Sequence, residues 1–217
     1  MTKPNNPLKK ELAHAVDVLK RGGVIVFPTE TSYGIGCDAT NAKAVRRVFR
    51  VKGRPDGKGT PLIVDSLAAA EHWGKFNVVA RKLAKKYWPG PLTIVVPETT
   101  PGVVSGLVLQ GKTIALRVSS HPIARALARG LGRPLVATSA NLSGEPACYS
   151  VRAFRRQIAI VHSRHPQPLL KKEGRVSITK EVDVIVDVGA LPRQKPTTLV
   201  RVVDYHIEIL RQGKIKL

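Results

Sequence analysis

The sequence contains few cysteines and no long apolar run, and both shortages narrow what the protein can be. Cys37 and Cys148 are the only cysteines in 217 residues, and they form neither a CxxC pair nor a disulfide framework, which favours a reducing compartment. No segment approaches the roughly 18 apolar residues of a membrane span, and the first residues lack the apolar core of a secretion signal. We therefore expect a cytoplasmic protein without membrane association.

Familiar ligand-binding motifs are also missing. Neither GxxxxGK[ST] nor GxGxxG occurs, so any bound anion must be held by side chains rather than by a P-loop or a Rossmann turn. No His, Cys and Asp residues have the spacing of metal ligands, and we interpret the polar stretch from His162 to His165, next to Pro166, as a solvated loop. We expect no protein-bound metal.

Acidic residues are scarce relative to basic ones. The chain has 36 Lys and Arg against 15 Asp and Glu, a formal net charge of +21. Such a charge suits a polyanionic ligand or partner, because phosphate contacts release counterions and steer association. It equally suits a generally solvated basic surface, since net charge bears on solubility and nonspecific binding more than on one site. The sequence alone leaves both interpretations open.

Strand-like and helix-like segments alternate along the chain, and a hydrophobic content of 43% over this length is enough for one large domain. The apolar runs predict strands at 24–27, 62–64, 92–96, 113–118, 135–137, 184–188 and 199–203. Helical spacing predicts helices at 8–19, 44–49, 67–73, 78–87 and 122–131. The alternation predicts an α/β fold with a twisted mixed sheet. We expect one domain over 1–217, with a surface connection at 161–181 and a final strand unit at about 183–217.

Three polar clusters stand at the ends of these predicted elements, where α/β proteins commonly bind ligands. They are PTETSYGIGCDA from Pro28, KGRP from Lys52 and TSANLSG from Thr138. Each cluster alone also suits ordinary structure. The first can be turn chemistry at Thr29, Thr31 and Ser32, the second a solvated helix end, and the third an N-cap and turn.

The order of these clusters, together with further segments, carries a family resemblance. With YWPGPLT, RVSSHP and ILRQG, the chain resembles the YrdC/TsaC family of threonylcarbamoyl-AMP synthases from about Arg21 to Gly213. The resemblance implies a YrdC-like twisted mixed sheet flanked by helices around a concave, positively charged cleft. It also implies synthesis of L-threonylcarbamoyladenylate from L-threonine, bicarbonate and ATP with release of pyrophosphate. The product would pass to a threonylcarbamoyl transferase complex for the t6A modification of tRNA.

Site residues follow from the same resemblance. The catalytic tetrad would be Lys52, Arg54, Ser139 and Asn141. Lys52 would hold the carbamate and the threonine carboxylate, and Arg54 the nucleotide phosphates, since a guanidinium fork suits bidentate phosphate contact. Ser139 and Asn141 would orient phosphate and substrate oxygens.

Two further sets complete the predicted site. A loop of small hydroxyls and glycines from Thr29 to Gly36 would receive L-threonine, with contacts from Thr29, Thr31 and Tyr33. ATP, arriving with Mg²⁺, would contact the tetrad and also Arg117, Ser143, Thr197 and Arg211. No protein nucleophile is needed, because the carbamate oxygen itself attacks the α-phosphorus, and catalysis then rests on positioning and charge.

Two segments depart from the family pattern, and two other functions stay open. Thr197-Thr-Leu-Val200 stands where many members have Ser-Thr-Val-Val and keeps a hydroxyl at its first position. Ser119 stands where proline is frequent, so we expect a less rigid loop at Ser119. One alternative is a YrdC-like protein that binds double-stranded RNA or tRNA without adenylate synthesis. Its RNA contacts would be to backbone and shape, because only 5% of residues are aromatic and none forms an RNP-like pattern. The other is a paralogue lacking the tetrad, which the intact tetrad disfavours.

Overall fold

The computed structural model describes residues 7–53, 59–99, 101–164 and 181–217, with no account of side chains at 160–164. Arg54 of the predicted tetrad, His165 and most of the predicted connection at 161–181 therefore lie outside the described residues. Along the described chain, helices and strands alternate as the sequence predicts.

Helices and strands have the following bounds. The helices are α1 (Pro7–Lys20), α2 (Ala42–Lys52), α3 (Leu67–Trp73), α4 (Val78–Tyr87), α5 (Pro122–Leu131) and α6 (Val151–Arg164), with a short 3-10 turn η1 (Gly106–Val108). The strands are β1 (Ile25–Pro28), β2 (Tyr33–Gly36), β3 (Leu62–Val64), β4 (Leu92–Pro97), β5 (Thr113–Val118), β6 (Leu135–Val136), β7 (Thr138–Ser139), β8 (Val184–Ile185), β9 (Thr198–Val203) and β10 (His206–Arg211).

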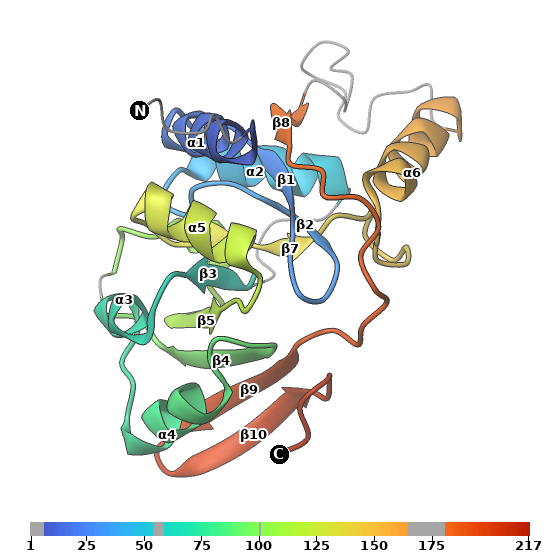
Figure 1. The fold of residues 1–217 in the computed structure, drawn as a ribbon. Helices are drawn as coiled ribbons and strands as arrows, with labels where there is room; N and C mark the ends of the chain where they lie inside the picture. The colour runs from blue at the N-terminus through green and yellow to red at the C-terminus, as the bar shows by residue number, and fades with distance from the viewer. Residues whose placement is uncertain (1–6, 54–58, 100, 165–180) are drawn as a thin grey trace, which may run out of the picture.

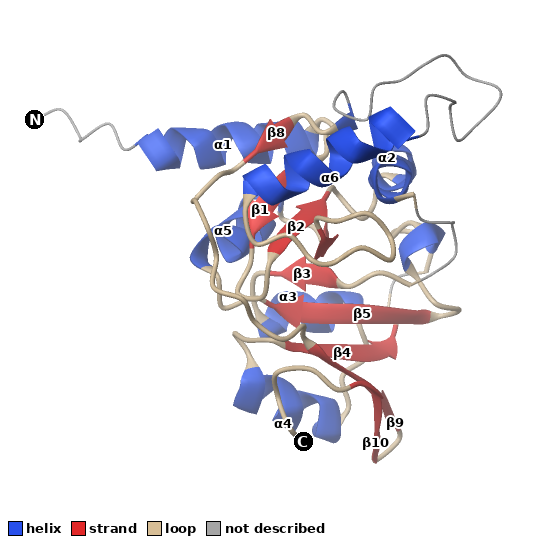
Figure 2. Cartoon of the chain, turned by 90° about the vertical axis from the view of Figure 1, so that its right-hand side faces the viewer, coloured by secondary structure: helices blue, strands red, loops and turns tan. Residues whose placement is uncertain are grey.

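The strands form two mixed sheets. The smaller has the order β7-β2-β1-β8, and the larger has the order β10-β9-β4-β5-β3-β6. Figure 1 shows α1 and α2 beside the smaller sheet, whereas α4 lies beside β9 and β10 at the opposite end. In Figure 2 the strands from β1 to β10 descend through the molecule as one stack. The predicted mixed α/β fold is confirmed, with its strands divided between two sheets.

The two sheets meet where β2 leaves the smaller one. The amide of Val136 in β6 donates to Cys37 O at 2.8 Å, and Asp38 bridges to Leu135. A Cβ added to Gly36 would lie 1.8 Å from Val136 O, a distance at which no side chain can be accommodated. Glycine at this position therefore permits the close approach that joins the sheets.

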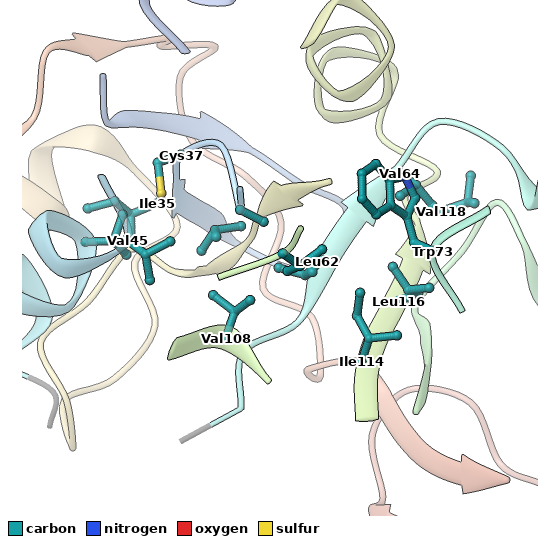
Figure 3. Packing of buried hydrophobic residues seen from close by; sticks show 14 of the residues in the cluster. Ile35, Cys37, Val45, Leu62, Val64, Trp73, Val108, Ile114, Leu116 and Val118 are labelled. Carbon is teal, nitrogen blue, oxygen red and sulfur yellow. The ribbon is translucent and has the colours of Figure 1, made fainter. Parts of the chain in front are cut away.

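The hydrophobic core runs across this junction. In Figure 3, Ile35 and Val45 lie at one end of the cluster and Leu116 and Trp73 at the other, with Leu62 of β3 between them. Helix α2 contributes through its apolar face, begins at an Asn41 side chain that accepts from Ala44 N at 3.1 Å, and ends at Gly53 with φ of 58°. This packing fixes Lys52, the last helical residue, against the protein interior.

Several expectations about local structure are wrong. Residues 161–164 are helical, so His162 belongs to α6 and not to a solvated loop; Val151, Phe154 and Ile158 are buried at helical spacing and hold that helix. Tyr33–Gly36, expected within a loop, is strand β2. Strand β8 covers two of the residues predicted at 184–188. Beyond it the connecting segment, residues 186–197, runs along one side of the molecule to β9 (Figure 1).

Candidate active site

A cavity of about 340 Å³ opens among the β1–β2 turn, β7, the connecting segment and the ends of β5 and β10. Its wall includes many of the residues predicted for the site from distant parts of the chain. These are Thr29, Thr31, Tyr33, Arg117, Ser139, Thr197 and Arg211. The fold therefore gathers the predicted threonine side and part of the predicted nucleotide side around one space.

Thr29 shapes the β1–β2 turn at the edge of this cavity. Its hydroxyl donates to Ser32 O at 2.7 Å and accepts from the amides of Thr31 and Ser32 at 3.2 and 3.3 Å. The hydroxyl of Thr31 lies 3.1 Å from that of Thr29. The turn chemistry considered from the sequence is thus present, and it places Thr31 in the cavity wall.

Tyr33 links the cavity wall to the connecting segment. Its buried phenol lies 2.8 Å from Gly189 O and 3.1 Å from Asp187 Oδ1, and it accepts from Val188 N at 3.0 Å. Burial is the main reason that the pKa of Tyr33 is raised. Tyr33 belongs to the cavity wall and to the core cluster, and its hydroxyl fixes the segment that carries the chain towards Thr197.

Strand β7 brings Ser139 beside the β1–β2 turn. Ser139 pairs with Gly34 of β2, and the next amide, that of Ala140, donates to Tyr33 O at 2.8 Å. Ser139 is consequently the tetrad member that stands in the described cavity wall.

Lys52 holds the loop that follows Ser139. Its side chain is 5% exposed, and Nζ donates to Ser139 O at 2.5 Å, Asn141 O at 2.8 Å and Asn141 Oδ1 at 3.2 Å. The interpretation of this residue as a solvated helix end is therefore wrong. The amide of Ser143 donates to Lys52 O at 2.8 Å, so the end of α2 and the TSANLSG loop form one unit.

Asn141 also uses its side chain within that unit. Its Nδ2 donates to Leu142 O at 2.9 Å and to Glu145 O, while Oδ1 accepts from Lys52. Lys52, Asn141 and Ser143 are not part of the described cavity wall, although they contact or adjoin Ser139, which is. The structure thus brings three tetrad members together and exposes one of them to the cavity.

Two guanidinium groups supply positive charge to the cavity. Arg211 donates from Nη2 to Thr197 Oγ1 at 2.8 Å and from Nε to Thr197 O at 3.1 Å. The pKa of Arg211 is lowered, mainly by burial and further by the charge of Arg117. Gly213 permits this arrangement, since a Cβ there would lie 2.2 Å from Pro196 O. An anion in the cavity would find both guanidiniums at its wall.

Arg117 is held by an acidic residue that the sequence reasoning missed. Its Nη1 lies 2.6 Å from Glu30 Oε1, and Ser119 donates its hydroxyl to Glu30 Oε2. Ser119 also accepts from His121 N at 3.1 Å, so the serine that stands where proline is frequent has hydrogen-bond partners on both sides. The position of Glu30 between two cavity threonines is the sequence signal that could have identified it.

Among the described residues, no three His, Cys, Asp or Glu side chains gather as they would around a metal ion. No helix in that part of the chain is long and apolar enough to cross a membrane.

Comparison with known proteins places this geometry in a family. The Sua5/YciO/YrdC family model, described as telomere recombination, matches residues 17–163. The chain belongs to this family. A threonylcarbamoyl-AMP synthase from Thiobacillus denitrificans is 42% identical over 179 residues, which are 79% of this chain and 87% of the relative. The uncharacterized protein YciO of Escherichia coli is 31% identical over 210 residues, 97% of this chain and 92% of that protein.

Solved structures show the same fold. The crystal structure of P. abyssi Sua5 complexed with L-threonine superimposes with a TM-score of 0.78 at 30% identity, covering 93% of this chain. The chain spans about half of that protein, 54% of its length. E. coli YciO superimposes with a TM-score of 0.73 at 30% identity and covers 98% of this chain and 96% of its own. These matches confirm the predicted family and fold.

Proposed function

We propose that the protein is a nucleotidyltransferase that makes L-threonylcarbamoyladenylate from L-threonine, bicarbonate and ATP and releases pyrophosphate. The observation that carries this proposal is the convergence of Thr31, Ser139, Arg117 and Arg211 on one cavity. Hydroxyls suit a small polar amino acid, and guanidiniums suit its carboxylate and the phosphates. The names of the curated relatives and the L-threonine complex of P. abyssi Sua5 support the same substrates.

The chemistry requires positioning more than a reactive side chain. The threonine amine adds to carbon dioxide with loss of a proton, or to bicarbonate with loss of water, and forms a carbamate. A carbamate oxygen then attacks the α-phosphorus of ATP while pyrophosphate leaves. We assign Arg117, Arg211 and Arg54 to neutralising the carboxylate and phosphate charges, a task for preorganised donors. Lys52 and Asn141 hold the Ser139 loop in place, and Mg²⁺ arrives with ATP.

The threonine side of the site rests on the β1–β2 turn. Thr29 fixes the turn, Thr31 offers a hydroxyl, and Tyr33 completes this part of the wall. On the nucleotide side we assign Thr197 and Ser143 together with the arginines. The wider concave, positively charged cleft implied by the family would surround this cavity.

A direct assay tests the proposal. The pure protein is incubated with labelled L-threonine, bicarbonate and ATP, and both L-threonylcarbamoyladenylate and pyrophosphate are measured. We expect pyrophosphate release that depends on threonine and bicarbonate, and a loss of roughly a hundredfold in Arg54→Ala, the scale for removing one preorganised donor. Release that ignores threonine, or no adenylate, would overturn the proposal.

The product needs an acceptor. We propose that a threonylcarbamoyl transferase complex takes the adenylate and modifies tRNA in the cytoplasm. Adding this protein to a transferase preparation that lacks its own synthase should restore t6A formation, whereas Arg54→Ala should not. Restoration by Arg54→Ala to the wild-type level would contradict the assignment.

A second candidate function is RNA binding, favoured by the net charge of +21, far beyond the about four charges of one nucleotide. We expect sequence-independent binding of tRNA or duplex RNA at low salt, with each phosphate contact adding about 0.7 to 0.9 to the log–log salt slope. ATP should compete in part if the cavity arginines contribute. A salt titration of tRNA binding with and without ATP measures both effects. Sequence-selective binding that survives high salt and ignores ATP would favour a dedicated RNA-recognition role.

A further inference from the structure

The Glu30 carboxylate joins two segments that are far apart in sequence. It stands in the β1–β2 turn between two residues of the cavity wall, and it contacts the end of β5 through both of its oxygens. One oxygen lies 2.6 Å from Arg117 Nη1, and the other accepts from the hydroxyl of Ser119. Both acceptor atoms are therefore committed to fixing one end of β5.

Burial makes this contact different from a surface ion pair. The side chains of Arg117 and Glu30 are 5% and 13% exposed, so the pair bears a desolvation cost that surface pairs escape. A buried ion pair adds little net stability compared with apolar residues. A role in orienting Arg117 therefore explains this buried pair better than a contribution to folding stability does.

The two partners face different surroundings. Arg117 belongs to the cavity wall, whereas Glu30 is not among the residues that form the described wall. Within the described residues Arg117 Nε has no hydrogen-bond acceptor although it is buried. The carboxylate thus holds the guanidinium at Nη1, while Arg117 as a whole remains part of the cavity wall.

A second positive charge lies near the pair. The pKa of Arg211 is lowered mainly by burial and further by the charge of Arg117. The Glu30 carboxylate at Arg117 Nη1 offsets part of this repulsion. Ser119 restrains the counter-charge itself, and it is anchored by the amide of His121 at the start of α5.

We propose that Glu30 is a positioning residue for the adenylate-forming reaction. It aims the Arg117 guanidinium at the anionic substrate from outside the cavity, with Ser119 orienting the carboxylate. This inference takes the reaction from the proposed function. Its central claim, an energetic coupling between Glu30 and Arg117, can also be measured by ligand binding.

The test is a double-mutant cycle on Glu30→Gln and Arg117→Ala, read in kcat and in KM for ATP. We expect Glu30→Gln alone to lower kcat by about tenfold to a hundredfold, the scale of a misplaced catalytic contact. Its KM for ATP should rise by about threefold to tenfold, less than kcat falls, because the misplaced guanidinium contacts the bound phosphates less well while the loss of the carboxylate charge favours anion binding. In the Arg117→Ala background the same change should cost less than about threefold further, since contacting residues that act together are not additive.

Glu71→Gln is the matched control. Glu71 pairs with Arg81 at 2.7 Å, also as glutamate with arginine, but at a surface site outside this cavity. Glu71→Gln should leave kcat and the KM for ATP close to their wild-type values. In the Arg117→Ala background it should cause no further change. Ser119→Ala provides a milder second cycle in case Glu30→Gln does not fold, with Ser119→Thr expected to restore kcat.

Several outcomes would overturn the inference. A folded Glu30→Gln variant with kcat within twofold of wild type is one. Effects of Glu30→Gln and Arg117→Ala that simply multiply are another, because a structural contact would lower activity independently of Arg117. If the wild type makes no adenylate, the proposed function fails, and the same cycle is read in the Kd of ATP by calorimetry. Multiplicative effects there, or no ATP binding by the wild type, reject the coupling.

Discussion

Replacing Lys52 by methionine separates two roles that this residue could have. In the structure its ammonium donates to Ser139 O, Asn141 O and Asn141 Oδ1, so it holds the loop that presents Ser139. The family resemblance instead assigns it to the carbamate and the threonine carboxylate. Methionine keeps most of the length of the side chain and removes its donors.

The size of the effect follows from two of those acceptors, Asn141 O and Oδ1, because Ser139 O still accepts from Asn141 N at 2.9 Å. A buried acceptor left without a donor costs about 1–3 kcal/mol, and two of them cost roughly 3–5 kcal/mol. Removing a buried ammonium returns part of its desolvation penalty, so we expect a net loss of about 2–4 kcal/mol. Domains of this kind are stable by about 5–15 kcal/mol, and Lys52→Met should therefore still fold.

Urea unfolding and adenylate formation are measured on the same preparations. With a slope of about 2 kcal/mol per molar urea, the unfolding midpoint of Lys52→Met should fall by about 1–2 M, and activity should fall by roughly a hundredfold or more. Lys43→Met, at the exposed start of the same helix, is the control and should change neither. An unchanged midpoint with lost activity would refute the loop-holding role and favour direct contact with substrate. Retained activity would refute both roles.

Much of the fold could be predicted because its signals are local. The segments 62–64 and 113–118 are runs rich in β-branched and other apolar residues, and helices 67–73, 78–87 and 122–131 have both apolar spacing and clear ends. Their predicted bounds are those of β3, β5, α3, α4 and α5. The prediction omitted α6 and β10, although the sequence holds signals for both. Val151, Phe154 and Ile158 have helical spacing, and 206–209 alternate between polar and apolar residues.

Strand β2 could not be predicted because what makes it a strand is not local. Tyr33–Gly36 contains two glycines and has the composition of a loop. It becomes a strand because β1 and β7 flank it, and because Gly36 tolerates Val136 O at a distance no side chain allows. Tertiary pairing here overrides a local preference for irregular structure.

The site divides in the same way. The resemblance predicted Thr197 and Arg211 as neighbours in function, and the structure places them in hydrogen-bond contact. No sequence pattern indicated that Glu30 pairs with Arg117, since their contact depends on how the β1–β2 turn meets the end of β5. Residue types and motifs thus predicted which groups belong to the site, and the fold determined which of them act on one another.

Three further predictions use separate features of the molecule. Gly36→Ala should destabilise the protein by roughly 3 kcal/mol or more in urea unfolding, because the new Cβ would lie 1.8 Å from Val136 O, and overpacking against backbone is strongly unfavourable; an unchanged midpoint would mean that the sheets do not meet there. Burial raises the pKa of Cys148 to about 11, against an opposing effect of Lys52. The native state then binds the thiol proton more tightly than the unfolded chain does. The contribution of this thiol to the free energy of unfolding is therefore complete below about pH 9 and is lost as the pH rises towards 11. Urea unfolding across this range should show a smaller loss in Cys148→Ala, and equal losses would contradict the burial. The last prediction concerns substrate choice. Thr31 stands in the cavity wall, and a site that hydrogen-bonds a hydroxyl rejects an analogue lacking it far better than it rejects a missing methyl group. In competition assays of adenylate formation, the preference for L-threonine over L-valine should be strong, and its preference over L-serine should be weaker. Thr31→Val should reduce the preference over valine, because it removes a polar partner while keeping the side-chain volume. Equal use of valine by the wild type would show that the β1–β2 turn does not read the hydroxyl.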